Sequence, residues 1–145
     1  VLAPALPSLG QVTSRPSLRH LVRARDVVDA RYAEPLTVQD LAAAAHMSRA
    51  HFSREFRSAF GESPYSYLLT RRLERAAILL RTTQRPILDI CLAVGLTSVG
   101  SFTSSFRRAF GTSPAAYRAS TAPVPGIAAV PQCVLRAHGR PSPTR

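Results

Sequence analysis

The chain has 145 residues, 46% of them hydrophobic, which is enough for one compact domain or two small ones. No apolar run reaches the roughly 18 residues that a membrane span needs, and two cysteines, Cys91 and Cys133, are too few for a disulfide framework or a zinc site. The formal charge is +11 at pH 7, and all 19 basic residues are arginine. Such a charge favours a polyanion, usually nucleic acid, as partner. Codon bias is an alternative reason for the absence of lysine, but it does not explain the net charge.

Both ends of the chain are predicted to lie outside the folded body. Residues 1–16 contain three prolines and no periodic apolar pattern, which indicates a flexible lead-in or linker. Residues 121–145 contain five prolines and no acidic residue, which indicates a disordered tail. No signal peptide is recognisable, so a cytoplasmic protein is expected. Because the chain begins with Val, a fragment of a longer protein and a standalone protein both stay open.

The first part of the predicted domain, 17–120, contains three helices. Apolar spacing predicts the first over 17–32, with Ser17 as its N-cap. Its inner face is expected to consist of Leu18, Leu21, Val22 and Val28. Thr37 and Asp40 predict a near capping box at the start of the second helix. After a turn at 46–47, the third helix spans 48–60, and its buried face is expected to consist of Phe52, Phe56 and Phe60.

The second part begins with a long helix and then repeats the same plan. Ser63-Pro64 opens a helix that runs to about Arg81, with Pro at the first helical position. The remaining predicted elements are a helix that starts near 86, a turn at 95–96, a helix over 99–110 and a helix over 113–119. Strand signals are weak throughout, so the predicted fold class is all-α with seven helices.

A sixteen-residue block occurs twice, at 52–67 and 102–117, with 9 of its 16 positions identical. Such a duplication indicates that one supersecondary unit was built twice. Each copy completes a unit made of a short helix, a tight turn and a helix with an aromatic inner face. This is the helix-turn-helix plan, whose second helix enters the major groove of DNA. The second unit has one extra residue between the turn and the first phenylalanine.

The outer face of the 48–60 helix carries arginines and small residues opposite the phenylalanines. By helical periodicity it consists of Arg49, Ala50, Ser53, Arg54 and Arg57, with His51 near the boundary. Arginines opposite an aromatic stripe are typical of a face that contacts DNA. The alternative is an ordinary solvated helix face.

The chain resembles the DNA-binding domain of the AraC/XylS family of bacterial transcription regulators. The motifs that carry the resemblance are L-A-x4-M-S-x3-F-x-R-x-F-R, two copies of F-G-x-S-P, and I-x-x-I-C-x-A-V-G-L-x-S, within roughly Leu18 to Arg118. The resemblance implies two helix-turn-helix units, 17–62 and 84–120, joined by a connecting helix at 63–83. Their recognition helices would enter adjacent major-groove segments of double-stranded DNA. It also implies an activator of transcription, located in the cytoplasm with the nucleoid, with RNA polymerase as a possible partner.

The resemblance assigns roles to residues of both recognition helices. The base-contacting candidates are Arg49, Ala50, Ser53 and Arg54 in the first unit, and Val99, Gly100, Ser101 and Ser104 in the second. The phosphate-contacting candidates are Arg57, Arg107 and Arg108. The second unit departs from the family pattern because it has Ser104 where an arginine is common. We therefore expect an asymmetric DNA site that is recognised mainly by the first unit.

Other residues give weaker signals. The arginines of the connecting helix, Arg71, Arg72 and Arg75, either add to the positive field or are solvated and paired with Glu74. Cys91 is expected to be a small core residue. The four histidines lack metal-ligand spacing, and no catalytic arrangement is recognisable, so no enzyme activity, cofactor, metal, membrane or small-molecule site is predicted. The alternative function is a helical protein-interaction module that binds an acidic partner.

Overall fold

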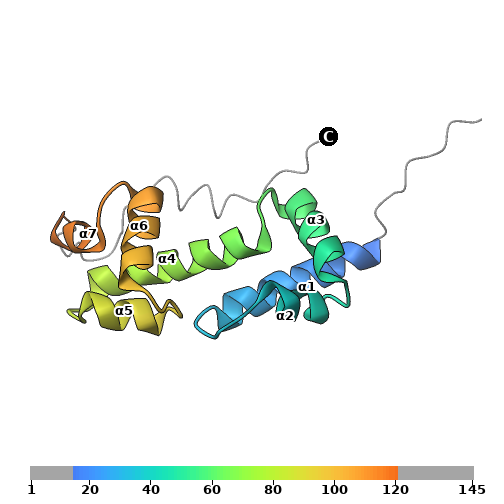
Figure 1. The fold of residues 1–145 in the computed structure, drawn as a ribbon, viewed down its shortest axis with the longest axis horizontal. Coiled ribbons are helices and arrows are strands. Elements are labelled where there is room, and N and C mark those ends of the chain that lie inside the picture. The colour runs from blue at the N-terminus through green and yellow to red at the C-terminus, as the bar shows by residue number, and fades with distance from the viewer. Residues whose placement is uncertain (1–14, 121–145) are drawn as a thin grey trace, which may run out of the picture.

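The computed structural model describes residues 15–120, which form seven helices and no strand. The helices are α1 (Arg15–Arg31), α2 (Val38–Ala44), α3 (Arg49–Phe60), α4 (Pro64–Thr82), α5 (Ile87–Ala93), α6 (Val99–Phe110) and α7 (Pro114–Ser120). Figure 1 shows α4 running lengthwise through the molecule, with α1–α3 at one end and α5–α7 at the other. The predicted all-α class with seven helices is confirmed. The predicted tail, 121–145, and residues 1–14 of the predicted lead-in lie outside the described residues.

The prediction was wrong at the start of α1. The helix begins at Arg15, so Pro16 belongs to the helix and Ser17 is not its N-cap. Proline is compatible with the first turn because the N–H it lacks would have no intrahelical partner there. Leu18, predicted to face the core, is 55% exposed. The buried stripe of α1 starts one turn later and consists of Leu21, Ala24 and Val28.

Short polar residues and glycines define several of the other helix ends. Thr37 and Asp40 form the predicted capping box of α2, in which the Asp40 amide donates to Thr37 Oγ1 (3.2 Å) and the Thr37 amide donates to Asp40 Oδ2 (2.8 Å). Serine hydroxyls accept a backbone N–H at the starts of α3, α4 and α6; these N-caps are Ser48, Ser63 and Ser98. Gly61 and Gly111 end α3 and α6 in the left-handed conformation, with φ of 78° and 76°.

The repeated sequence block is also a repeated packing unit. Every residue from 51–67 has the same degree of burial as its counterpart in 101–117. In the first block the Phe56 ring lies against Phe52, Phe60 and Tyr67, with centroids 5.5, 4.6 and 5.8 Å away. The second block repeats these contacts among Phe102, Phe106, Phe110 and Tyr117. The identical residues therefore specify the interior of each unit.

Helix α4 belongs to both units. Its first turns add Tyr67 and Leu68 to the first hydrophobic core, and its later turns add Leu73 and Leu80 to the second. α1 packs against α2, α3 and α4, and α4 packs in the same way against α5, α6 and α7. Thus α4 is the last helix of the first unit and the first helix of the second. Among the described residues, no helix is long and apolar enough to cross a membrane.

Candidate nucleic-acid interface

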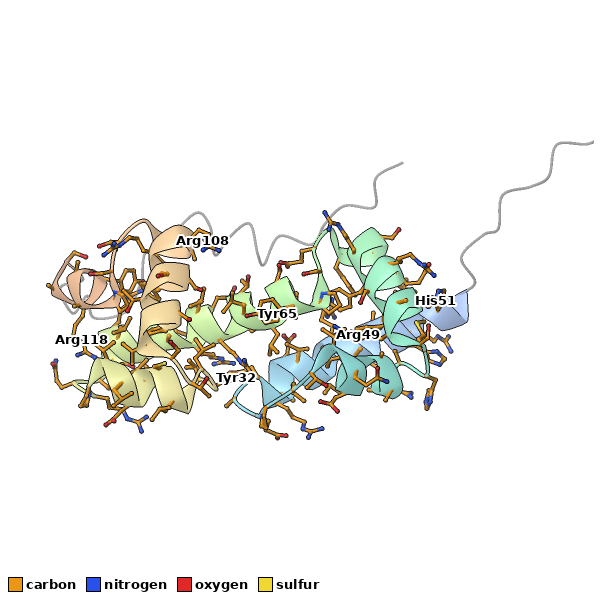
Figure 2. All side chains as sticks on the ribbon, viewed as in Figure 1. Tyr32, Arg49, His51, Tyr65, Arg108 and Arg118 are labelled. Atoms are coloured by element: carbon orange, nitrogen blue, oxygen red, sulfur yellow. The ribbon has the colours of Figure 1, made fainter. Side chains whose placement is uncertain are left out.

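The outer face of α3 is exposed because its inner face is fixed in the first core. Phe52 and Phe56 are fully buried. The exposed side chains on this helix include Arg49, Ala50, His51, Arg54 and Arg57, and Ser53 is half-buried. Figure 2 shows Arg49 and His51 on the α3 ribbon, toward the end that follows the α2–α3 turn. The helix therefore presents three arginines to solvent.

The outer face of α6 has smaller side chains. Gly100, Ser101 and Ser104 are exposed, and Val99 is half-buried. Both charged residues, Arg107 and Arg108, belong to its last turn, and Figure 2 shows Arg108 at the end of α6 that leads to α7. The first turn of α6, unlike that of α3, thus offers no long hydrogen-bond donor.

The fold brings the predicted site residues together on two helices. Each of them is exposed or half-buried on α3 or α6. In the view of Figure 1, these two helices run in roughly the same direction from the two ends of α4. A helix of 19 residues is ~28 Å long. This length is comparable with the ~34 Å that separates successive major-groove segments on one face of DNA.

Two further residues belong to these faces but were not among the predicted site residues. His51 is exposed and occupies the place in α3 that Ser101 has in α6. Thr103 is half-buried and corresponds to Ser53. The fifty-residue offset between the repeated blocks is the signal that identifies both.

The arginines of α3 and α6 are not neutralised by nearby acidic groups. Within residues 15–120, no ion pair or side-chain hydrogen bond involves Arg49, Arg54, Arg57, Arg107 or Arg108. The carboxylates of Asp29, Glu34 and Glu74 pair with other arginines. Five exposed guanidinium groups without acidic partners make these two helix faces positively charged, and such a charge attracts anions.

In contrast, Arg71 on α4 is engaged inside the protein. Its Nε donates to Asp29 Oδ1 (2.6 Å), and its Nη1 donates to Glu74 Oε2 (3.0 Å). The Tyr67 hydroxyl donates to Asp29 Oδ1 (3.0 Å) and accepts from Arg71 Nη2 (3.1 Å). Desolvation lowers the pKa of Arg71, but its hydrogen bonds and charge interactions with Tyr67 and Asp29 outweigh this effect and raise it. Arg71 thus fixes α4 to α1.

Three other arginines also contact groups of the protein itself. Arg72 Nε donates to the carbonyl oxygen of Tyr32 (2.7 Å), and the Arg75 guanidinium lies 5.4 Å from the centre of the Tyr32 ring. Arg118 on α7 donates to the carbonyl oxygens of Leu80 (3.4 Å) and Arg85 (2.5 Å), at and just after the end of α4. Arginines that bind carbonyl oxygens at helix ends satisfy acceptors with no intrahelical partner.

Cys91 is a core residue, as expected. It is fully buried, and its Sγ donates to the carbonyl oxygen of Leu96 (3.6 Å). Burial raises the pKa of the thiol, which disfavours the reactive thiolate. Across residues 15–120, no three His, Cys, Asp or Glu side chains are grouped so that they could bind a metal ion.

Comparisons with known proteins concern the same region of the chain. A protein-family profile described as a helix-turn-helix domain matches residues 41–120. The chain is 40% identical over 88 residues to the transcriptional regulator Rob of Salmonella typhimurium, a match that covers 61% of this chain and 30% of Rob. It is 36% identical over 91 residues to the regulatory protein SoxS of Escherichia coli, which covers 63% of this chain and 85% of SoxS. The chain therefore spans about 30% of the length of Rob but most of the length of SoxS.

Solved structures share the arrangement of helices. The DNA-binding domain of AdpA, crystallised with a target DNA, superposes with a TM-score of 0.66 at 37% identity, covering 69% of this chain and 90% of that domain. The C-terminal domain of AraT, a response regulator from Geobacillus stearothermophilus, gives a TM-score of 0.70 at 30% identity, covering 81% of this chain and 97% of that domain. An AraC-type transcriptional regulator from Chromobacterium violaceum gives a TM-score of 0.66 at 35% identity, and the match covers 73% of this chain and 95% of the solved chain.

Proposed function

Because this chain belongs to the AraC/XylS family of helix-turn-helix transcription regulators, we propose that it binds a specific sequence in double-stranded DNA and regulates transcription. The observation that carries this proposal is the set of five exposed, uncompensated arginines on α3 and α6. It is supported by the similarity to the AdpA domain, whose structure contains a target DNA.

We assign the two helices to adjacent major-groove segments. α3 and α6 are the second helices of their units, which is the position of the recognition helix in this motif. The unit boundaries that we propose are 17–62 and 84–120, with 63–83 as the connection. Because α4 is packed into both cores, it joins the two units that carry the recognition helices.

The two units are proposed to contribute differently to sequence recognition. Arg49 and Arg54 have the length and the donors to contact guanine edges, whereas Ala50 and Ser53 would make shorter contacts. On α6, Val99 and Gly100 lack hydrogen-bonding side chains, and Ser101 and Ser104 are short. The second unit would therefore act through a thymine methyl group, DNA shape and phosphates. The proposed phosphate contacts are Arg57, Arg107 and Arg108.

The role in the cell follows from the family. We propose an activator that works in the cytoplasm on nucleoid DNA, with RNA polymerase as its protein partner, and that has no catalytic activity. The relative that supports activation is RclR of Escherichia coli, which is described as a transcriptional activator and is 42% identical over 82 residues.

Titration with salt tests DNA binding against the alternative of an acidic protein partner. The affinity for a duplex selected from random sequences should fall steeply with salt, with a slope of log K against log [salt] of about −0.9 per phosphate contacted. Replacement of Arg107 by alanine should reduce that slope by about 1, both on the selected duplex and on a random duplex of equal length. Equal affinity for the selected duplex, the random duplex and a poly-glutamate competitor would contradict sequence-specific binding.

A further inference from the structure

The turn between α1 and α2, residues 32–36, lies between the two units. Figure 1 shows it beside the α5–α6 turn, and Figure 2 shows Tyr32 at the same place. The Tyr32 side chain packs against both hydrophobic cores. This turn is therefore a second contact between the units, in addition to the continuous helix α4.

A side chain of helix α4 holds the 32–36 turn by hydrogen bonds to the backbone of the turn. Arg72 donates from Nε to the Tyr32 carbonyl oxygen (2.7 Å) and from Nη2 to the Glu34 carbonyl oxygen (2.8 Å). The Leu36 amide also donates to the Glu34 carbonyl oxygen (2.8 Å). A planar guanidinium that donates to two carbonyl oxygens fixes both the position and the orientation of the turn.

The second unit contacts the same turn through Gly95. A Cβ atom at Gly95 would lie 2.7 Å from the carbonyl oxygen of Ala33 and 3.0 Å from its carbonyl carbon. Backbone atoms cannot rotate away, so this close approach requires glycine. The corresponding turn of the first unit has His46, which also adopts a positive φ, of 56°, and whose side chain is exposed. A positive φ alone therefore does not require glycine in this turn.

We propose that the 32–36 turn is a positioning element that fixes α6 relative to α3 and so makes the protein selective for the spacing between the two DNA segments. This inference rests on the proposed function. A single connecting helix can bend and twist, whereas two separate connections hold the units in one relative orientation. We call these two connections, α4 and the 32–36 turn, the frame. One base pair added between the segments moves the second by ~3.4 Å and turns it by roughly 35°. A rigid frame cannot follow that change without losing contacts.

Two variants weaken the frame, and each has a matched control. Gly95→Ala introduces a methyl group against the Ala33 backbone. Its control is Gly111→Ala, because Gly111 has a similar positive φ of 76° but a Cβ atom there would meet no neighbouring atom within 4 Å. Arg72→Met removes the two hydrogen bonds to the turn, and Arg81→Met removes an equal charge from the same helix. Gly111→Ala should lower the Tm by about 4–8 °C through backbone strain alone.

The distance between the units is the first readout, and it needs no DNA. Spin labels are attached at Ser58→Cys on α3 and Ser101→Cys on α6, both exposed positions, in a Cys133→Ser background, while Cys91 is fully buried. The distance distribution should be narrow in the otherwise unaltered protein and in both controls. It should broaden in Gly95→Ala and Arg72→Met. Equally narrow distributions in all variants would overturn the proposal.

Binding to duplexes with altered spacing is the second readout. The protein without substitutions should bind the selected duplex about tenfold more tightly than a duplex with one base pair added between the two segments. That preference should fall several-fold in Gly95→Ala and Arg72→Met and stay unchanged in the controls. Unchanged preference in variants with broadened distances would overturn the role in spacing. If the starting protein prefers no duplex at all, the proposed function fails, and the distance distributions still decide whether the turn fixes the frame.

Discussion

Among the described residues, the arginines of α3 and α6 differ from several arginines of α4 and α7 in what they contact. On α3 and α6 they are exposed and have no acidic partner among the described residues. On α4 and α7 several of them bind carboxylates or carbonyl oxygens of the protein, as Arg71, Arg72 and Arg118 do. The arginines of α3 and α6 are therefore available to bind an anion, whereas Arg71, Arg72 and Arg118 hold parts of the protein together.

The substitution Arg54→Ala tests the assignment of sequence recognition to α3. Loss of a bidentate contact to a base should weaken specific binding by about 1–3 kcal/mol and relax the preference at one base pair. Ser104→Ala, at the corresponding place in α6, should change specific binding much less. Both are measured by titration of the selected duplex and of single-base variants at one salt concentration. Equal losses in the two variants would refute the asymmetry.

At the scale of elements, the shared helix α4 explains how two units form one molecule. Arg71 connects it to Asp29 of α1 and to its own Glu74, whose side chain is 8% exposed. The Tyr67 hydroxyl joins the same network, and burial raises the pKa of Tyr67 to about 12. These groups hold the first turns of α4 against α1, and so they orient the rest of the helix toward the second unit.

Removal of the Arg71 guanidinium should therefore destabilise the first unit. We expect Arg71→Met to lower the free energy of unfolding by about 2–3 kcal/mol, since Asp29 and the buried Glu74 would lose a cationic partner. Arg81→Met on the same helix serves as the control and should cost less than about 0.5 kcal/mol. Urea unfolding followed by circular dichroism measures both. A loss in Arg71→Met no larger than in the control would show that the network does not stabilise the fold.

The capping box of α2 predicts a specific pH dependence. Hydrogen bonds from Thr37 hold the pKa of Asp40 below its ordinary value of 3.8. A carboxylate with a depressed pKa stabilises the fold above that ordinary value and loses this contribution as the pH falls through the lowered pKa. The Tm difference between the starting protein and Asp40→Asn should thus be constant near neutral pH and shrink below about pH 4. A difference that stays constant down to pH 2 would contradict this role.

At the scale of the whole molecule, the sequence predicts local structure well and contacts between the units poorly. Helix order, the capping box of α2 and both aromatic faces follow from periodicity and short motifs such as Ser63-Pro64, which act within a few residues. The predicted start of α1 was wrong because prolines in the lead-in suggested irregular structure. Pro16 is nevertheless compatible with a first helical turn. The bonds from Arg72 to the 32–36 turn and the approach of Gly95 to Ala33 join distant segments through backbone atoms. No side-chain pattern indicates such contacts.

The two units have matching interiors and different outer faces. The identical residues of the repeated blocks are mostly those that fill the cores, so duplication preserves the fold while the surfaces diverge. The first unit has Arg49 and Arg54 where the second has Val99 and Ser104. One molecule would therefore present two unlike surfaces to neighbouring segments of DNA.

Selection of bound duplexes from a random DNA pool tests whether α3 and α6 recognise DNA unequally. We predict enrichment of one non-palindromic sequence, with strongly preferred bases in the segment bound by α3 and weak preferences about one helical turn away. Repetition with Arg54→Ala should remove preference from the stronger segment only. Enrichment of two equally informative segments, or of a palindrome, would contradict recognition mainly by the first unit.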